Sequence, residues 1–242
     1  MTDAQRPSLT VVIPAYDEEN HIAGTLATIA EFLSGRGDRF EILVVDDGST
    51  DRTVEIASDN APVGCRVLRL VRNRGKGAAI RTGVLASRGD RVLLCDADLA
   101  TPITDLERLE PGLEEASIVI GSRAVAGSDV TRPQGAGRQS MGKTLNRMLH
   151  MMGVCEEIQD TQCGFKLLDG EVARMMFRQM TIDRFAFDIE LLMLAKTLEV
   201  KVLEVGVHWE DQPFSSVRPI RDSMRTLFDI LRVRWRNRSL RP

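Results

Sequence analysis

Short apolar runs alternate with amphipathic runs along the first half of the chain. Leu9 to Ile13 are rich in β-branched residues and end at Pro14, which is typical of a buried strand. Apolar residues then recur at helical spacing until Gly35, as expected of a helix that packs on one face. The same alternation predicts strands over residues 9–13, 40–45, 67–71, 92–95 and 117–120, and helices over 51–58, 78–87 and 104–113.

This alternation predicts an α/β fold with a mostly parallel sheet and helices on both faces. A polar loop follows each expected strand, and the carboxyl ends of parallel strands meet at one edge, where open α/β sheets bind ligands. We therefore expect the polar side chains of these loops to lie close together. They are Tyr16, Asp17, Glu18, Asp46, Asp47, Asn73, Lys76, Asp96, Asp98 and Arg123.

The second half of the chain begins with a segment that has little periodicity. Residues 124–143 alternate glycines with basic residues such as Arg132 and Arg138, and a long loop of this kind is usually a functional lid or a disordered segment. The pattern then predicts a strand over 164–168, helices over 171–180 and 188–198, and a strand over 200–207.

Composition and charge are those of a soluble globule with a basic tail. The 242 residues are 43% hydrophobic and 28% charged, which allows one large α/β domain or two small ones. The net charge is −3. Residues 218–242 hold eight Arg and two Asp, so their net charge is +6, and the net charge of the remaining residues is −9. A basic tail on an acidic body favours contact with an anionic surface.

The tail also has an apolar stripe. Met224, Leu227, Phe228, Leu231 and Trp235 fall on one side of a helix, with arginines beside them. A basic amphipathic helix can lie in the headgroup layer of a membrane, and docking on the domain or on another subunit is the open alternative. Nucleic-acid binding is not expected, because stacking aromatics apart from Trp235 are missing from the tail.

Targeting and redox signals are few. The four cysteines form no C-x₂-C pair, so the sequence indicates no zinc site. It also has no basic-then-apolar leader and no apolar run near 20 residues. We therefore expect a protein of the reducing cytoplasm, associated peripherally with the cytoplasmic face of a membrane.

The strongest chemical signal is a pair of carboxylates at the end of an apolar strand. Residues 91–95 run directly into Asp96 and Asp98. Side chains at i and i+2 of a strand share a face, and such oxygen ligands suit Mg²⁺ or Mn²⁺ shared with substrate phosphates. A solvated turn after a strand is the alternative, and the pattern by itself leaves the two about equal.

Seven segments resemble family 2 glycosyltransferases with the GT-A fold, a Rossmann-like nucleotide-binding architecture. Their residues are 12–19, 44–51, 73–77, 96–98, 121–123, 160–166 and 184–192. The last two are long and are similar to the dolichyl-phosphate glucosyltransferase branch, beside the dolichyl-phosphate mannose synthases. The resemblance covers residues 9–209. It implies one domain over 1–212, with a nucleotide-sugar part at 9–123 and an acceptor part at 124–212, followed by the basic amphipathic segment 213–242.

The resemblance implies where the nucleotide-sugar binds. An aromatic at position 16 can stack on a base, and a helix that opens with Gly-Lys-Gly suits a diphosphate. For Asp47 the alternative is a turn residue before a glycine. The residues assigned to the nucleotide-sugar are Pro14, Tyr16, Glu18, Val45, Asp47, Lys76, Asp96, Ala97 and Asp98.

The resemblance also implies a metal-assisted, inverting displacement. Asp98 is the expected metal ligand, with Asp96 at the metal, at a metal-bound water or at the ribose. Ala100 stands where the mannose synthases carry Gln, which favours the glucosyl branch. A lipid phosphate is mostly dianionic at neutral pH, so the site needs cations more than a strong base. The candidates for the acceptor phosphate are Arg123, Arg138 and Lys166, with Arg132 a weaker one; ordinary surface solvation is the alternative for each.

Asp160 is a candidate for orienting the sugar or the acceptor, with a capping role as the alternative. Asp98, Asp160 and Arg138 are thus the expected catalytic residues. By composition Phe185 and Phe187 are expected in the core, and Asp188 and Glu190 either shape the sugar pocket or favour a helix N-terminus.

Other protein classes fit the sequence less well. A dinucleotide oxidoreductase needs G-x-G-x-x-G after the first strand, and a sugar nucleotidylyltransferase needs a glycine-rich signature there; residues 14–16 are Pro-Ala-Tyr. A mannose synthase that uses GDP-mannose and a non-catalytic nucleotide-binding protein remain the two alternatives to a glucosyltransferase that uses UDP-glucose and a polyprenyl phosphate.

Overall fold

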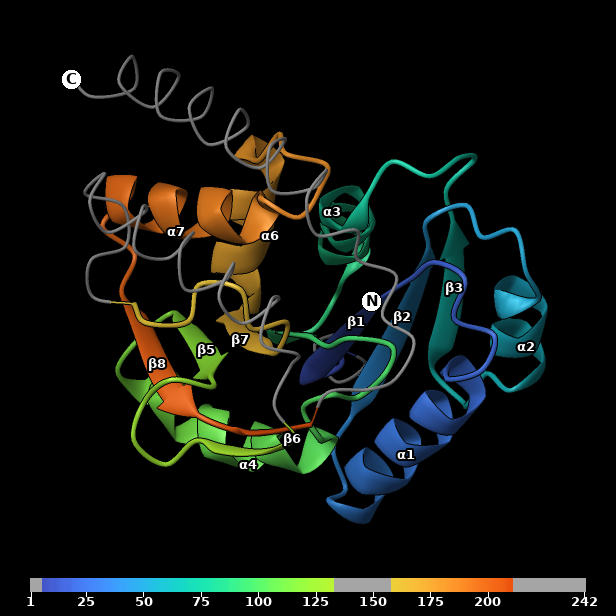
Figure 1. Cartoon of the computed structure of the whole chain (residues 1–242), viewed down its shortest axis with the longest axis horizontal. Coiled ribbons are helices and arrows are strands. Elements are labelled where there is room, and N and C mark those ends of the chain that lie inside the picture. Colours follow the sequence, from blue (N-terminus) through green and yellow to red (C-terminus); the bar gives the residue numbers. More distant parts are fainter. Residues whose placement is uncertain (1–5, 133–157, 211–242) are drawn as a thin grey trace.

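A twisted, mostly parallel sheet forms the centre of the fold (Figure 1). The computed structural model describes residues 6–132 and 158–210. Within them the larger sheet has seven strands in the order β3-β2-β1-β4-β7-β5-β8. The strands are β1 (Leu9–Ala15), β2 (Phe40–Asp46), β3 (Cys65–Arg69), β4 (Arg91–Leu94), β5 (Ile118–Ser122), β7 (Lys166–Asp169) and β8 (Val202–Gly206), while β6 (Asp129–Arg132) pairs with β9 (His208–Glu210) in a second sheet.

Helices cover both faces of the sheet, as the alternating pattern predicts. Neighbouring residues of β1 show why: Val12 packs into one hydrophobic cluster, and Val11 and Ile13 into the other. The first cluster includes residues of α3, α6 and α7, and the second includes residues of α1, α2 and α4. The helices are α1 (Ile22–Gly35), α2 (Thr53–Asp59), α3 (Lys76–Ala86), α4 (Leu106–Leu109), α6 (Gly170–Gln179) and α7 (Phe187–Thr197), with 3₁₀ turns Ile103–Asp105 and Glu110–Glu114.

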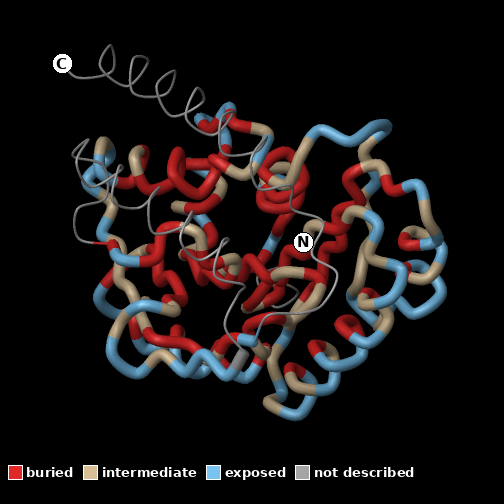
Figure 2. The backbone as a smooth tube through the Cα atoms, viewed as in Figure 1, coloured by how far each residue is buried: buried red, intermediate tan, exposed pale blue. Residues whose placement is uncertain are grey.

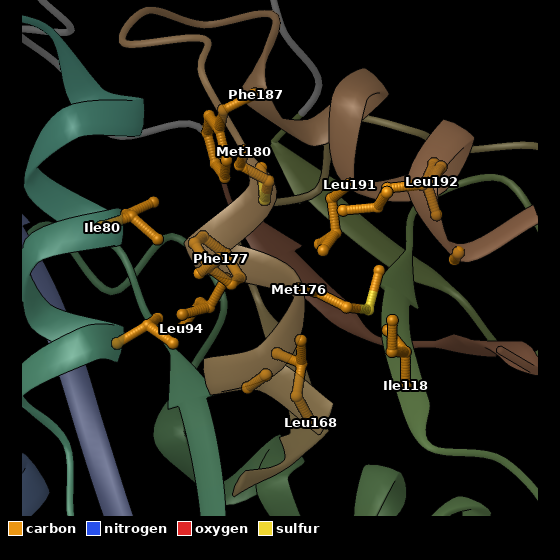
Figure 3. Close-up of a cluster of buried hydrophobic side chains, with 14 of the residues drawn as sticks. Ile80, Leu94, Ile118, Leu168, Met176, Phe177, Met180, Phe187, Leu191 and Leu192 are labelled. Carbon is orange, nitrogen blue, oxygen red and sulfur yellow. The ribbon is translucent and has the colours of Figure 1, made fainter. Parts of the chain in front are cut away.

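The cluster under α3, α6 and α7 joins the two halves of the chain (Figure 3). Ile80 of α3 lies in the same cluster as Phe177 of α6 and Phe187 of α7. Figure 2 shows that buried residues follow the strands and the inward sides of the helices. Because α3 and α7 share one core, their first residues are held at fixed positions relative to the sheet.

The order of the strands reverses at β1, which has β2 on one side and β4 on the other. In an open α/β sheet this arrangement opens a crevice beyond the carboxyl ends of the two strands, where ligands bind. Tyr16 is the first residue after β1, and Asp96 is the second residue after β4. The fold therefore sets both loops beside this crevice.

Strand β7 departs from the regular parallel pattern. It runs antiparallel to β4 and β5, with Lys166 opposite both Leu94 and Ile120. Since an antiparallel strand enters the sheet where its neighbours leave it, the segment before β7 reaches the same edge as the loops after β4 and β5. The sequence pattern did not reveal this reversed direction.

Three other elements differ from expectation. The helix expected over 104–113 is broken into a short α4 between two 3₁₀ turns, and Pro111 lies in the second turn, where it lacks the N–H that an α-helix uses. The expected strand over 200–207 is β8 followed by β9, and β6 lies inside the segment expected to be irregular. The expected C-terminal helix lies outside the described residues. Among the residues described, no helix is both long and apolar enough to cross a bilayer.

Candidate active site

Hydrogen bonds join the loops that follow β1 and β2. The amide of Glu18 donates to Thr53 Oγ1 at 2.7 Å, and the amide of Asp17 donates to Ser49 Oγ at 3.0 Å. In return, Asp17 accepts from the amide of Thr50 at 2.8 Å. Asp17 has a φ of 54°, a conformation that Asp tolerates better than most residues. The two loops thus form one connected wall beside the crevice.

Asp47 connects this wall to the start of α3. Its buried carboxylate accepts hydrogen bonds from the amides of Arg74 at 2.8 Å and Gly75 at 2.7 Å. Burial raises its pKa more than these two amides lower it. Gly75 has a φ of 115°, and a Cβ there would lie 2.5 Å from the carbonyl oxygen of Asp183, so only glycine fits. A carboxylate has about four acceptor positions, which leaves Asp47 capacity for a ligand N–H.

The structure separates the expected nucleotide-binding residues into two kinds. Tyr16 and Glu18 are partly exposed in the loop after β1, and Pro14 is partly buried near the end of that strand. Val45 and Ala97 are buried, and the carbonyl of Ala97 accepts a hydrogen bond from Thr25 Oγ1 at 2.5 Å. Because the side chains of Val45 and Ala97 are packed in the core, only the backbones of these two residues could contact a nucleotide.

Lys76 and Asp96 form an ion pair across the crevice. Lys76 Nζ lies 2.5 Å from Asp96 Oδ1, and both side chains are partly exposed. Burial alone would lower the pKa of Lys76, but Asp96 and Asp188 outweigh it and raise that pKa. Burial likewise would raise the pKa of Asp96, yet Lys76 and more distant cations bring it below its usual value. Both groups are therefore charged, and the first turn of α3 carries a cation at this edge of the sheet.

Asp98 lies in a tight turn beside this pair. Its Oδ1 accepts a hydrogen bond from the amide of Ala100 at 3.1 Å. Leu99, between them, has a φ of 49°, an unfavourable conformation for a branched residue and one that is frequent at functional sites. Burial, and then the charge of Asp96, raise the pKa of Asp98. The turn therefore holds a carboxylate that a nearby cation would stabilise.

The carboxylates fit a divalent ion that is shared with substrate. Across the two described stretches, no group of three or more His, Cys, Asp or Glu side chains is arranged to hold a metal. Mg²⁺ commonly uses one or two carboxylates and completes its shell with waters and substrate phosphates. Asp98 fits such a role, whereas Asp96 Oδ1 is already engaged by Lys76.

Arg123, which follows β5, and Asp160, which precedes β7, form a bidentate ion pair. Arg123 donates from Nε to Asp160 Oδ2 at 2.6 Å and from Nη2 to Oδ1 at 2.8 Å. Its guanidinium also lies over the ring of Trp209, 5.3 Å from the ring centroid. A guanidinium has five N–H donors, so donors beyond those two can contact an anion. The guanidinium of Arg123, a candidate for binding the acceptor phosphate, is therefore oriented by the carboxylate of Asp160 and the ring of Trp209.

Lys166 is buried in a place that differs from the expected acceptor-facing one. Its side chain has no exposed surface, and Nζ lies 2.5 Å from Asp188 Oδ1 while also donating to the carbonyl of Cys163. The N–H donors of this ammonium are therefore directed at protein groups, Asp188 and the carbonyl of Cys163.

The remaining candidates fall at or beyond the limits of the described residues. Arg138 and the segment 213–242 lie outside them, and Arg132 is the last residue of β6.

Glu190 accepts hydrogen bonds from the amides of Thr181 and Ile182, at 2.9 Å and 2.7 Å from Oε2. Glu190 thus lies in the first turn of α7 and holds the backbone of the segment between α6 and α7.

Residues 10–179 match the sequence model of the family described as Glycosyl transferase family 2. The chain belongs to glycosyl transferase family 2. It is 36% identical to the dolichyl-phosphate beta-glucosyltransferase of Mus musculus, over 97% of this chain and 77% of that protein. The corresponding enzyme of Homo sapiens is 34% identical, with the same coverage. The chain is thus a glycosyltransferase.

Solved structures agree on the GT-A type of fold. Glucosyl-3-phosphoglycerate synthase of Mycobacterium tuberculosis, crystallised with Mn²⁺, UDP and glucosyl-3-phosphoglycerate, superposes with a TM-score of 0.71 at 20% identity, over 94% of this chain and 80% of that one. Mannosyl-3-phosphoglycerate synthase of Rubrobacter xylanophilus gives 0.69 at 18% identity, over 95% and 73%. At such identities the likeness concerns the fold alone.

Sequence reasoning missed two contacts of this glycosyltransferase. Trp209 was not a candidate, because its contact with Arg123 arises only when β9 pairs with β6. The partner of Lys166 was also missed, although Asp188 was considered for the sugar pocket. A lysine within an apolar stretch, as in Phe165-Lys166-Leu167, is the signal that could have indicated a buried ion pair.

Proposed function

We propose that this glycosyltransferase moves glucose from UDP-glucose to the phosphate of a polyprenyl lipid, with Mg²⁺ or Mn²⁺ bound at Asp98. The observation that carries the proposal is the convergence at one sheet edge of the Lys76–Asp96 pair, Asp98 and the Arg123–Asp160 pair. The names of the relatives support glucose and dolichyl phosphate. The crystallised neighbour with Mn²⁺ and UDP supports the metal and the nucleotide.

The donor half holds the nucleotide and stabilises its leaving group. Asp47 accepts an N–H of the base, and Tyr16 lies in the loop where an aromatic ring can stack on it. Lys76, at the first turn of α3, contacts a diphosphate oxygen together with nearby backbone N–H groups. A divalent cation supplies further charge stabilisation as the diphosphate leaves.

The acceptor half orients a phosphate for direct displacement. An acceptor phosphate oxygen forms a bond to the anomeric carbon as the bond from that carbon to the UDP oxygen breaks. The phosphate is mostly dianionic at neutral pH, because its second pKa is about 6. Arg123, fixed by Asp160 and Trp209, provides directed N–H groups for that anion.

Donor preference tests the proposal directly. We expect kcat/KM with a polyprenyl phosphate acceptor to be at least about 100-fold higher for UDP-glucose than for GDP-mannose, because discrimination is a ratio of these values. The measurement is a radiolabelled transfer assay with each donor at matched acceptor concentration. A preference for GDP-mannose would support the mannose synthase instead. Tight UDP binding without transfer to any lipid phosphate would support a non-catalytic nucleotide-binding protein.

The basic tail is proposed to bring the enzyme to its lipid. Each basic residue near an anionic leaflet contributes about 1 kcal/mol, and the attraction weakens with salt. We expect the full chain to sediment with vesicles that contain phosphatidylserine at low salt, and a chain truncated before Pro219 to stay in the supernatant. Vesicles of phosphatidylcholine alone are the control. Equal sedimentation of both chains, or of neither, would assign the tail a structural role.

A further inference from the structure

The buried ion pair between Lys166 and Asp188 has no direct part in the proposed chemistry. Its two charged atoms lie 2.5 Å apart, and the side chains are 0% and 8% exposed. Lys166 is the first residue of β7, and Asp188 lies in the first turn of α7. The pair therefore ties the beginning of a central strand to a helix on the face that also carries α3.

Lys166 also holds the segment that precedes it. Its ammonium donates to the carbonyl of Cys163, which fixes the backbone just before Gly164. A Cβ on Gly164 would lie 2.1 Å from Asp96 Oδ2, so the backbone of this residue closes one side of that carboxylate. Lys76 closes the other side at Oδ1. The orientation of Asp96 is thus set by Lys76 and by a backbone that Lys166 holds.

The other end of the same segment reaches the acceptor half. Asp160 forms the bidentate ion pair with Arg123, and its amide donates to Glu204 of β8 at 2.7 Å. One segment, residues 160–166, therefore contacts a donor-side carboxylate through Gly164 and an acceptor-side cation through Asp160.

We infer that Lys166 and Asp188 are positioning residues that fix residues 160–166, and thereby set Asp96 and Arg123 relative to each other. This inference rests on the proposed function for the donor and acceptor roles of those two groups. Stability alone does not account for the pair, since a buried ion pair can often be replaced by apolar residues at no loss. An apolar pair would lack the hydrogen bond to Cys163 and the positive charge behind Asp96.

The experiment compares removal of one partner with removal of both. Lys166→Met leaves Asp188 buried without its cation and should unfold at a lower temperature. Lys166→Met combined with Asp188→Leu should restore Tm to within about 4 °C of wild type, since no charge is left unpaired. Asp188→Asn is a milder third variant, because its amide oxygen can still accept from the ammonium.

We expect stability and function to separate in the double variant. Affinity for UDP in the presence of Mn²⁺, measured by calorimetry, should fall about tenfold or more, as for the loss of supporting groups behind a metal site. The kcat/KM for the lipid phosphate should fall at least as far. Glu41→Gln is the matched control, because Glu41 is buried and paired with Arg88 at 2.8 Å at the opposite end of the sheet; it should lower Tm without changing UDP affinity.

Restored stability together with wild-type UDP affinity and kcat/KM would overturn the inference. If the double variant failed to fold, wild-type UDP affinity of Lys166→Met, measured below the Tm of that variant, would do the same. Failure of wild type to transfer glucose to a lipid phosphate would remove the proposed function alone. The UDP–Mn²⁺ affinities would still decide whether the pair positions Asp96.

Discussion

Asp98→Asn is expected to lower kcat/KM by about 100-fold or more, because a bound divalent ion supplies several kcal/mol of charge stabilisation to the departing group. The fold should be unaffected. The amide oxygen of Asn can accept the hydrogen bond that Asp98 now takes from Ala100. Burial and the neighbouring Asp96 already disfavour the charge of Asp98, so Tm should stay the same or rise, as it can when a functional charge is removed.

Two measurements separate this result from a general loss of charge. Asp59→Asn makes the same chemical change on the exposed end of α2, and it should leave kcat/KM unchanged. Wild type in excess EDTA should lose activity to the level of Asp98→Asn and recover it with added Mn²⁺. Full activity of wild type in chelator would exclude the assigned role of Asp98.

Sequence patterning predicted the parts of this fold that depend on local residue order. Strands β1 and β2 begin at the expected residues 9 and 40, because each is a β-branched or apolar run between polar turns. The meeting of polar loops at one edge followed from parallel topology, and the contacts of Asp96 with Lys76 and of Asp47 with Gly75 agree with it.

Features that depend on the return path of the chain could not be predicted in this way. The short apolar run of β7 has no residue that indicates its direction, yet its antiparallel direction brings Asp160 to Arg123. The partner of Lys166 is 22 residues away on a helix. The residue type alone predicts that a lysine contacts an anionic ligand. The structure instead buries Lys166 against Asp188.

The approach of Trp209 to Arg123 depends on the same kind of long-range path. The amide of Glu210 donates to the carbonyl of Ala100 at 2.9 Å, so β9 is joined to the loop that carries Asp98. Trp209 is thereby brought within 5.3 Å of the Arg123 guanidinium. Asp98 and Arg123, which we propose for the metal and the acceptor, are thus connected by a strand whose sequence alone predicts only extended structure.

Arg123→Lys is expected to lower kcat/KM for the lipid phosphate by roughly 10- to 100-fold, because a charge-assisted hydrogen bond contributes about 1.5–3 kcal/mol. Lysine keeps the charge but loses the planar fork that now engages both oxygens of Asp160. It also loses the flat face that stacks on Trp209. The ammonium would then neutralise Asp160 in part without presenting directed N–H groups to the acceptor.

The decisive measurement pairs acceptor kinetics with donor binding. Affinity for UDP with Mn²⁺ should change less than about threefold, since the Asp47 and Lys76 contacts are untouched and lysine keeps a positive charge near Asp96. Arg88→Lys is the matched control, because Arg88 also donates from Nε and Nη2 to a buried carboxylate, Glu41, but at the opposite end of the sheet. If Arg123→Lys weakened UDP binding as much as it weakened acceptor use, Arg123 would belong to the donor half, and the acceptor phosphate would need another cation.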